Sequence, residues 1–308
     1  MKLPAMYLAL AAIAVASPAH AQRDETAPVS ERTREAIATG EIYRAVGEWR
    51  LSSRDDGCSI TRNFAHDGDR FTLSLKRIHP GHDVIQYALI GDLNRRRRPI
   101  EAGFVPGPEL RVNYRVAEGS MGDREGYVYA GPLFMPEPDR EVQAGEYVLA
   151  QATEYYVVQN AQRRPLVLQT GSMRPALQSL DNCLRDQLES YGVAMSGPDV
   201  AVRAPRVTNM GELSAQVSRN YPIGARAEGY QGIVRLRLIV DGQGDIVRCH
   251  HADFLAARLL REDACRMMQE HATFVPARNR SGEGVPGYFF QNIVYDLNSI
   301  FDVSRTRP

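Results

Sequence analysis

Apolar and polar residues alternate along the chain from Trp49 onward, in segments separated by turn residues at Asp67–Asp69 and Pro80–Gly81. The apolar members of this alternation are Cys58, Ile60, Phe64, Phe71, Leu73, Leu75, Ile85, Tyr87 and Leu89. Because successive side chains of a strand point to opposite faces of a sheet, a period of two indicates half-buried strands. The pattern therefore predicts an antiparallel meander of three strands.

Further alternation follows at Leu110–Val116 and Tyr127–Tyr129, and Tyr155–Val158 faces Leu166–Leu168 across a polar turn. The period then changes to three and four, at Leu177, Leu180, Leu184, Leu188 and Tyr191. That spacing is typical of an amphipathic helix, for which Ser172 is the expected N-cap and Gly192 the stop. We therefore predict a β-rich domain at residues 45–192 that ends in a helix.

A flexible lead-in is expected at residues 22–44, which are polar and contain one helical stretch at Glu31–Thr39. Residues 193–210 carry Gly and Pro but no amphipathic pattern, so they are predicted to form a linker.

Residues 211–308 are predicted to form a second, smaller domain. Its expected elements are a short polar helix at Glu212–Arg219, a strand at Ile233–Val240, a turn at Asp241–Gly244, a second strand at Asp245–His250, a helix carrying Leu260 to His271, and a last strand at Tyr288–Leu297. Three antiparallel strands and a helix make a two-layer α+β module. The predicted fold class of the whole chain is α+β.

The N-terminus has the layout of a secretory signal peptide. Lys2 precedes an apolar run at Met6–Ala16, and Ala19 and Ala21 form a small-residue cleavage site before Gln22. The run is shorter than the roughly 20 residues that span a bilayer. Residues 1–21 are therefore predicted to be removed between Ala21 and Gln22 on export to the periplasm. The alternative is an uncleaved segment that anchors the chain in the inner membrane, facing the periplasm.

The second domain resembles the TonB C-terminal domain family in an ordered set of motifs: Tyr221, Pro222, Ala225, Arg226, Gly229, Gly232, the turn at Asp241–Gly244, and Phe274–Ala277. The resemblance implies a module that binds another envelope protein, such as an outer-membrane TonB-dependent receptor, by strand addition. It implies protein-binding roles for Tyr221 and Pro222, and for the last strand at Gln291, Ile293 and Tyr295. The alternative for each of these residues is a purely structural role in the core.

The four cysteines of an exported chain are expected to form two disulfides, since the count is even. The count alone does not fix the pairing. With one bridge inside each domain, the pairs are Cys58 with Cys183 and Cys249 with Cys265. Zinc binding by Cys249, Cys265 and the nearby histidines is the disfavoured alternative, because an oxidising compartment favours the bridge.

The net charge of the chain and its candidate reactive residues limit the classes of function that it can have. The net charge is zero, so no global field attracts nucleic acid. The run of Arg95, Arg96, Arg97 and Arg98 is a candidate contact for an acidic partner or lipid, and otherwise a solvated loop. No catalytic residue, metal or cofactor is assigned, so the chain is expected to be a non-enzymatic binding protein. An envelope enzyme with its site in the first domain remains the alternative from another class.

Overall fold

The computed structural model describes residues 29–78, 80, 84–93, 99–106, 110, 117–121, 124–134, 145–251 and 257–297. The predicted signal peptide with its cleavage site at Ala21 and Gln22, the four arginines Arg95–Arg98 and most of the predicted strand at 110–116 lie outside these residues.

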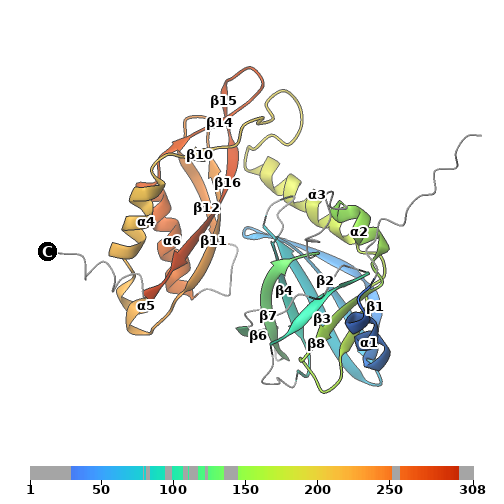
Figure 1. Ribbon diagram of the computed structural model, residues 1–308. Coiled ribbons are helices and arrows are strands. Elements are labelled where there is room, and N and C mark those ends of the chain that lie inside the picture. Colours follow the sequence, from blue (N-terminus) through green and yellow to red (C-terminus); the bar gives the residue numbers. More distant parts are fainter. Residues whose placement is uncertain are drawn as a thin grey trace, which may run out of the picture.

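The first domain consists of one curved sheet and three helices (Figure 1). Its elements are α1 (Glu31–Thr39), β1 (Glu41–Arg54), β2 (Gly57–His66), β3 (Asp69–Arg77), β4 (Val84–Ile90), β5 (Glu101–Val105), β6 (Ala117–Met121), β7 (Arg124–Pro132), α2 (Glu146–Ala152), β8 (Tyr155–Gln159), β9 (Leu166–Gln169) and α3 (Arg174–Ser190). The nine strands follow the order β5-β8-β9-β1-β2-β3-β4-β7-β6.

The predicted meander is confirmed as β2, β3 and β4, which pair antiparallel in chain order. The hairpin of Tyr155–Val158 with Leu166–Leu168 is confirmed as β8 and β9. β1 lies between β9, with which it pairs parallel, and β2, with which it pairs antiparallel. The pairing with β9 involves only Glu41–Arg44, so the later half of β1 has a strand neighbour on one side only within the described part of the sheet.

The core of the first domain lies between the sheet and α3, whose leucines at 177, 180 and 184 are fully buried in it. Gly192, at φ +84°, ends this helix as predicted. The N-cap is Met173 rather than Ser172, because the Ser172 hydroxyl donates to the carbonyl oxygen of Ala150 instead.

The sheet begins earlier than the sequence pattern indicates. β1 starts at Glu41, inside the residues that were expected to form a flexible lead-in, and Tyr43 is completely buried. The helical stretch at Glu31–Thr39 is helix α1, capped by the Ser30 hydroxyl, which accepts from the backbone N–H of Thr33. Its Ala36 packs with Val157 and Val167, which anchors the helix on the sheet.

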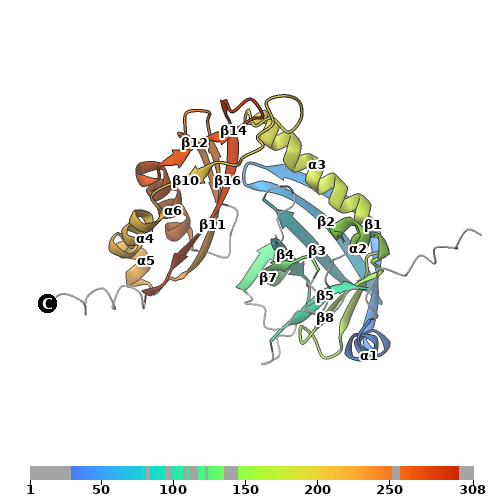
Figure 2. The same ribbon diagram turned by 45° about the horizontal axis from the view of Figure 1, so that its top comes forward.

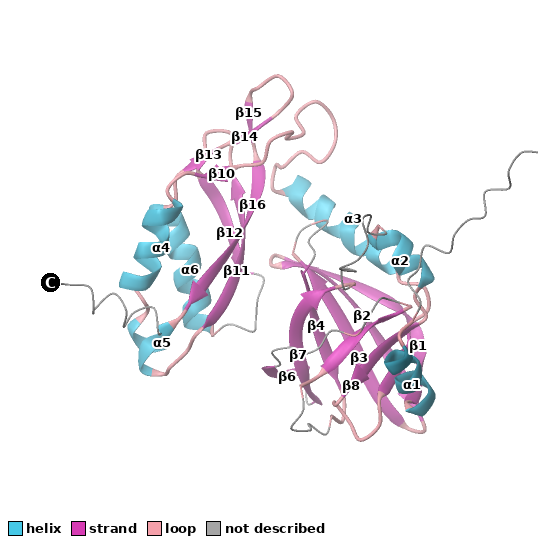
Figure 3. Cartoon of the chain, in the orientation of Figure 1, coloured by secondary structure: helices cyan, strands magenta, loops and turns pink. Residues whose placement is uncertain are grey.

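The second domain has a three-stranded antiparallel sheet covered on one face by helices (Figure 3). Its elements are β10 (Arg206–Val207), α4 (Met210–Arg219), α5 (Ile223–Ala227), β11 (Gly232–Val240), β12 (Ile246–His251), α6 (Arg258–His271), β13 (Phe274–Val275), β14 (Ala277–Arg278), β15 (Gly284–Val285) and β16 (Gly287–Tyr295). The strand order is β12-β11-β16, and the predicted two-layer α+β module is confirmed.

One side of this sheet packs on α4 and α6. Val234, Leu236, Leu238 and Val240 of β11 share a core with Leu260, Ala264, Met267 and Met268 of α6. Between β11 and β12, the Asp241 side chain accepts from the backbone N–H groups of Gln243, Gly244 and Asp245, which fixes the predicted turn.

The other side of the sheet faces the first domain at the end of α3 (Figure 2). The contact is partly apolar, with Leu188 and Val193 packed on Ile239. Residues 193–210, predicted as a linker, thus include a buried side chain at Val193, the short strand β10 and the first residue of α4. Across the described residues, the helices are too short or too polar to cross a membrane.

Candidate functional site

A groove with a volume of about 350 Å³ runs between α4 and the outer edge of β16. Its lining residues are Met210, Leu213, Ser214, Val217 and Ser218 from α4, Met268 from α6, and Gln291, Asn292, Ile293, Val294 and Asp296 from β16 and its end. The groove therefore combines an apolar helical wall with the rim of a sheet.

β16 is an edge strand, since β11 is its one strand neighbour in the described sheet. Four consecutive β16 residues line the groove, at positions 291 to 294. Consecutive residues point to opposite faces, so a groove that touches all four follows the edge of the strand and not one face. In an antiparallel pair, every second residue directs its N–H and C=O groups away from its partner. The groove thus borders backbone groups that can form a further ladder.

Helix α4 forms the wall of the groove because of its own amphipathic spacing. Leu213 is buried and Val217 is half-buried, one turn apart on the same side of the helix. Ser214 is exposed and Ser218 is half-buried beside them, and both also line the groove. The sequence predicted this helix, but not its role. The pair Leu213 and Val217 is the signal that could have found the wall.

Gln291 and Ile293 are the predicted binding residues that the structure brings to the groove. Gln291 is half-buried, whereas the Ile293 side chain lies mostly in the core, with 6% of its surface exposed. Pro222 lies at the start of α5 and does not line the groove.

Tyr221 and Tyr295 lie in the core, with their rings in edge-to-face contact and a centroid separation of 5.4 Å. The Tyr221 hydroxyl donates to the carbonyl oxygen of Tyr230, and the Tyr295 hydroxyl donates to Asp263 Oδ2 at 2.9 Å. Burial, followed by the charge of Asp263, raises the pKa of Tyr295. These two tyrosines therefore support the end of β16 from beneath, while their side chains are unavailable to a ligand in the groove.

Both predicted disulfides are present. Cys58 of β2 is bonded to Cys183 of α3, and Cys249 of β12 is bonded to Cys265 of α6. The second bridge ties the helical layer to the sheet beside the core. Since both of its sulfurs are in the disulfide, Cys249 and Cys265 supply no thiolate for zinc.

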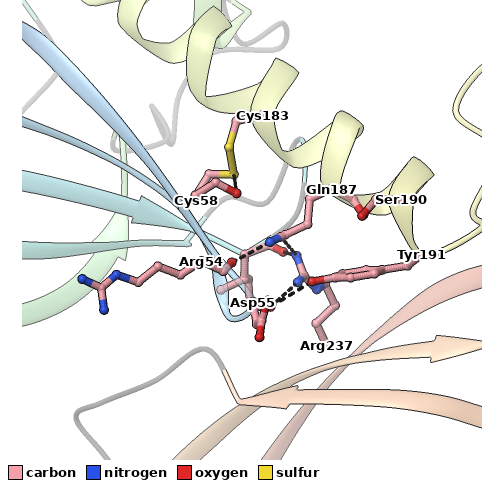
Figure 4. Close-up of a disulfide and its surroundings, with 10 residues drawn as sticks. Arg54, Asp55, Cys58, Cys183, Gln187, Ser190, Tyr191 and Arg237 are labelled. Carbon is pink, nitrogen blue, oxygen red and sulfur yellow. Dashed lines mark hydrogen bonds between the residues drawn. A yellow bond between two sulfur atoms is a disulfide. The ribbon is translucent and has the colours of Figure 1, made fainter.

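Arg237 is a buried arginine of β11 for which no role was predicted from the sequence. It lies on β11 with 1% of its surface exposed, on the sheet face opposite α6. It donates to the carbonyl oxygen of Ile78 at 2.6 Å. It also donates to Gln187 Oε1 at 2.9 Å and to the carbonyl oxygen of Asp55 at 2.9 Å (Figure 4). All three acceptors belong to the first domain. The sequence places Arg237 between Leu236 and Leu238, but Arg235 has the same setting two positions earlier, so the pattern alone does not single out Arg237.

Aromatic and cationic groups surround this arginine. The Tyr191 ring stacks on His250 with centroids 5.2 Å apart, and the Arg248 guanidinium carbon lies 4.7 Å from the Tyr191 centroid. Burial, followed by the charge of Arg237, lowers the pKa of His250 to about 4. His250 is therefore neutral at physiological pH. The second domain thus has one face packed on the first domain, and β16 is an edge strand of its sheet within the described residues.

Comparison with known protein families gives a match in the second domain. Residues 217–297 match the model of the family described as Gram-negative bacterial TonB protein C-terminal. No curated protein and no solved structure matches the chain significantly. The matched segment starts at Val217, near the end of α4, and ends just after β16. It therefore includes the β16 side of the groove with Val217 and Ser218, but not Met210, Leu213 and Ser214. The second domain of this chain is a TonB C-terminal-like domain, as its motifs indicated.

Proposed function

We propose that the second domain binds an extended segment of an envelope protein, such as an outer-membrane TonB-dependent receptor, by adding it as a strand to the edge of β16. The observation that carries this proposal is the groove that follows β16 through four consecutive residues. A bound segment would form main-chain hydrogen bonds with Gln291–Tyr295, and every second side chain would enter the groove against α4.

The chemistry of the groove suits such a segment. Met210, Leu213, Val217 and Met268 supply an apolar wall, whereas Ser214, Ser218 and Gln291 supply hydrogen-bonding groups. Main-chain pairing gives affinity that depends little on sequence, and the wall selects for small apolar side chains.

This role places the protein in the periplasm, with residues 1–21 removed, and gives it no catalytic step. The buried charged groups of the first domain bind one another, which supports a structural role for them and not a catalytic one. Arg77 is bound to Asp181 and Glu146, at 2.8 Å and 2.6 Å, and Tyr147 donates to Asp181. These groups join β3, α2 and α3 to one another.

The test is site-specific photocrosslinking of the full chain in intact envelopes, with the photoreactive residue at Asn292. We expect a crosslink to an outer-membrane receptor, within the extended segment of that receptor. Replacing Ser214 by Trp should fill the groove and reduce the crosslink about tenfold, because the side chains of the added strand then collide with the indole.

The matched control is Arg219→Trp, which places the same side chain on α4 at an exposed position that does not line the groove. It should leave the crosslink unchanged. A crosslink that is equally strong from Tyr230, or that survives Ser214→Trp, would contradict binding at the edge of β16.

A further inference from the structure

A second groove, of about 660 Å³, lies in the first domain beside the disulfide Cys58–Cys183. It runs between the end of β1 and one side of α3. The lining residues are Leu51, Ser53, Arg54 and Asp55 from β1 and its turn, and Ser179, Asn182, Cys183, Asp186, Gln187, Ser190 and Tyr191 from α3 and its end. The family match does not include this region.

The strand that borders this groove has an open edge. β1 pairs with β9 only through Arg44, whereas it continues beside β2 to Arg54. Between these points lie Gly47, at φ +73°, and an irregularity in the register with β2 from Val46 to Arg50. From Arg50 to Arg54 the pairing with β2 is regular. Alternate N–H and C=O groups of this stretch therefore point away from β2, with no described strand beside them.

The groove lies on the side of β1 to which an added strand would direct every second side chain. Leu51 and Ser53 line it, two residues apart on the side of the sheet that faces α3. A strand paired with the outer edge of β1 would direct every second side chain to that side. Those side chains would then lie against Asn182 and Asp186 of α3. Leu51, at 48% exposure, is available for contact with such a strand.

The charged residues that line the groove indicate which side chains of a ligand it would favour. Asp55 and Asp186 both line it. The third charged residue is Arg54, whose guanidinium points away from α3 while its carbonyl oxygen accepts from Gln187 Nε2 (Figure 4). The groove is therefore acidic, and it complements a lysine or arginine side chain.

We propose that the first domain binds an extended, basic segment of a partner protein as an additional strand on the outer edge of β1. Main-chain pairing occurs along Arg50–Ser53, because the Arg54 carbonyl oxygen already accepts from Gln187 Nε2. A lysine or arginine side chain of the added strand enters the groove toward Asp186. The site borders the contact between domains, since Asp55, Gln187 and Tyr191 line the groove and also hold Arg237. The proposal does not depend on the binding role of β16.

The test uses two synthetic peptides with the full chain. One alternates threonine and valine around a central lysine, and the other has glutamate in place of that lysine. Hydrogen exchange of the backbone is followed by mass spectrometry. We expect the lysine peptide to slow exchange at residues 48–54, and the glutamate peptide to do so about fivefold less effectively at equal concentration.

Asp186→Arg should reverse this preference, because the groove then presents a cation to the peptide. Glu189→Arg is the matched control, since Glu189 is exposed on the same helix but does not line the groove. It should keep the preference for lysine. Reversal of preference also separates a binding role for Asp186 from simple loss of folding, which would abolish protection by both peptides.

Three results would overturn the proposal. They are equal protection by both peptides, protection at residues 287–295 without protection at residues 48–54, and protection of residues 48–54 that rises with protein concentration in the absence of peptide. The last result would show that a second copy of this chain occupies the edge.

Discussion

The guanidinium of Arg237, in the second domain, donates to the carbonyl oxygen of Ile78, in the first domain, at 2.6 Å. This bond joins residues 159 positions apart in the chain. Its geometry explains why an arginine is buried in a strand of a small module: a planar guanidinium can reach three acceptors on different elements at once. The domains are therefore held by directed hydrogen bonds as well as by apolar contact.

Replacing Arg237 by Met should separate the domains. The three acceptors would lose their donor inside the contact, and we expect the free energy of unfolding to fall by about 3 kcal/mol. Arg237→Lys should recover little of this, because an ammonium cannot span the same acceptors. Small-angle scattering should show a larger radius of gyration for both variants. Arg226→Met, at an exposed position of the same domain, is the control and should leave both quantities unchanged.

Acid should weaken the same contact through His250. Burial, followed by Arg237, lowers its pKa from 6.5 to about 4, with Arg248 acting in the same direction and Asp55 and Asp56 opposing it. The unfolded chain therefore binds more protons than the native protein below about pH 6.5, so native stability is complete above that pH and declines toward about pH 4. Thermal unfolding at a series of pH values measures this decline.

His250→Phe provides the control for this pH dependence. Phenylalanine keeps an aromatic ring on Tyr191 but cannot be protonated, so the decline between about pH 6.5 and about pH 4 should become shallower. An identical pH profile in both proteins would show that other groups control the acid response.

Breaking the buried ion pair of Arg77 and Asp181 should strongly destabilise the protein. Burial alone would lower the pKa of Arg77, but the hydrogen bond and charge of Glu146 and the charge of Asp181 outweigh it, so its pKa is raised. Arg77→Met leaves Asp181 uncompensated and should reduce the free energy of unfolding by about 4 kcal/mol, measured with urea.

The double variant Arg77→Met with Asp181→Leu should recover most of that loss, since it removes both charges together. Arg174→Met, on the exposed side of α3, serves as the control for loss of one positive charge. If the double variant were as unstable as the two single losses combined, the pair would not act as a unit.

The intact mass of the protein recovered from fractionated cells tests export and oxidation together. We expect a soluble chain that begins at Gln22 and is lighter than the reduced form by the four hydrogens of two disulfides. A membrane-bound chain that still carries Met1 would favour the anchored alternative. Two free thiols under denaturing, non-reducing conditions would contradict one of the two bridges.

The spacing of apolar residues predicted those strands and helices whose buried face is visible in a short stretch of sequence. The alternation from Cys58 to Leu89 gave β2, β3 and β4, and the leucine spacing gave α3. The first half of β1 was missed because its inward positions carry few large apolar side chains apart from Tyr43. The parallel pairing of β1 with β9 joins segments far apart in the chain, and no periodicity reports that.

In the candidate sites, too, some residues were predicted from the sequence and others became evident only from the packing of the fold. Gln291 and Ile293 were found because the family motifs point to the last strand, whereas the opposite wall at Leu213 and Val217 depends on how α4 packs. Tyr221 and Tyr295 are aromatic residues beside the site, but packing places their rings in the core. Arg237 and Asp186 depend on contacts between distant segments, so their surroundings become visible only in three dimensions.

The position of β1 inside the sheet has a consequence for the order in which the two domains fold. The disulfide of the first domain joins cysteines 125 positions apart, and β1 pairs with β9 from the far end of the same domain. Such non-local contacts slow folding. The bridge of the second domain spans 16 positions, and β11 and β12 are neighbours in the chain. We therefore expect the second domain to fold first, and Arg237 to reach its acceptors only once the slower first domain is complete.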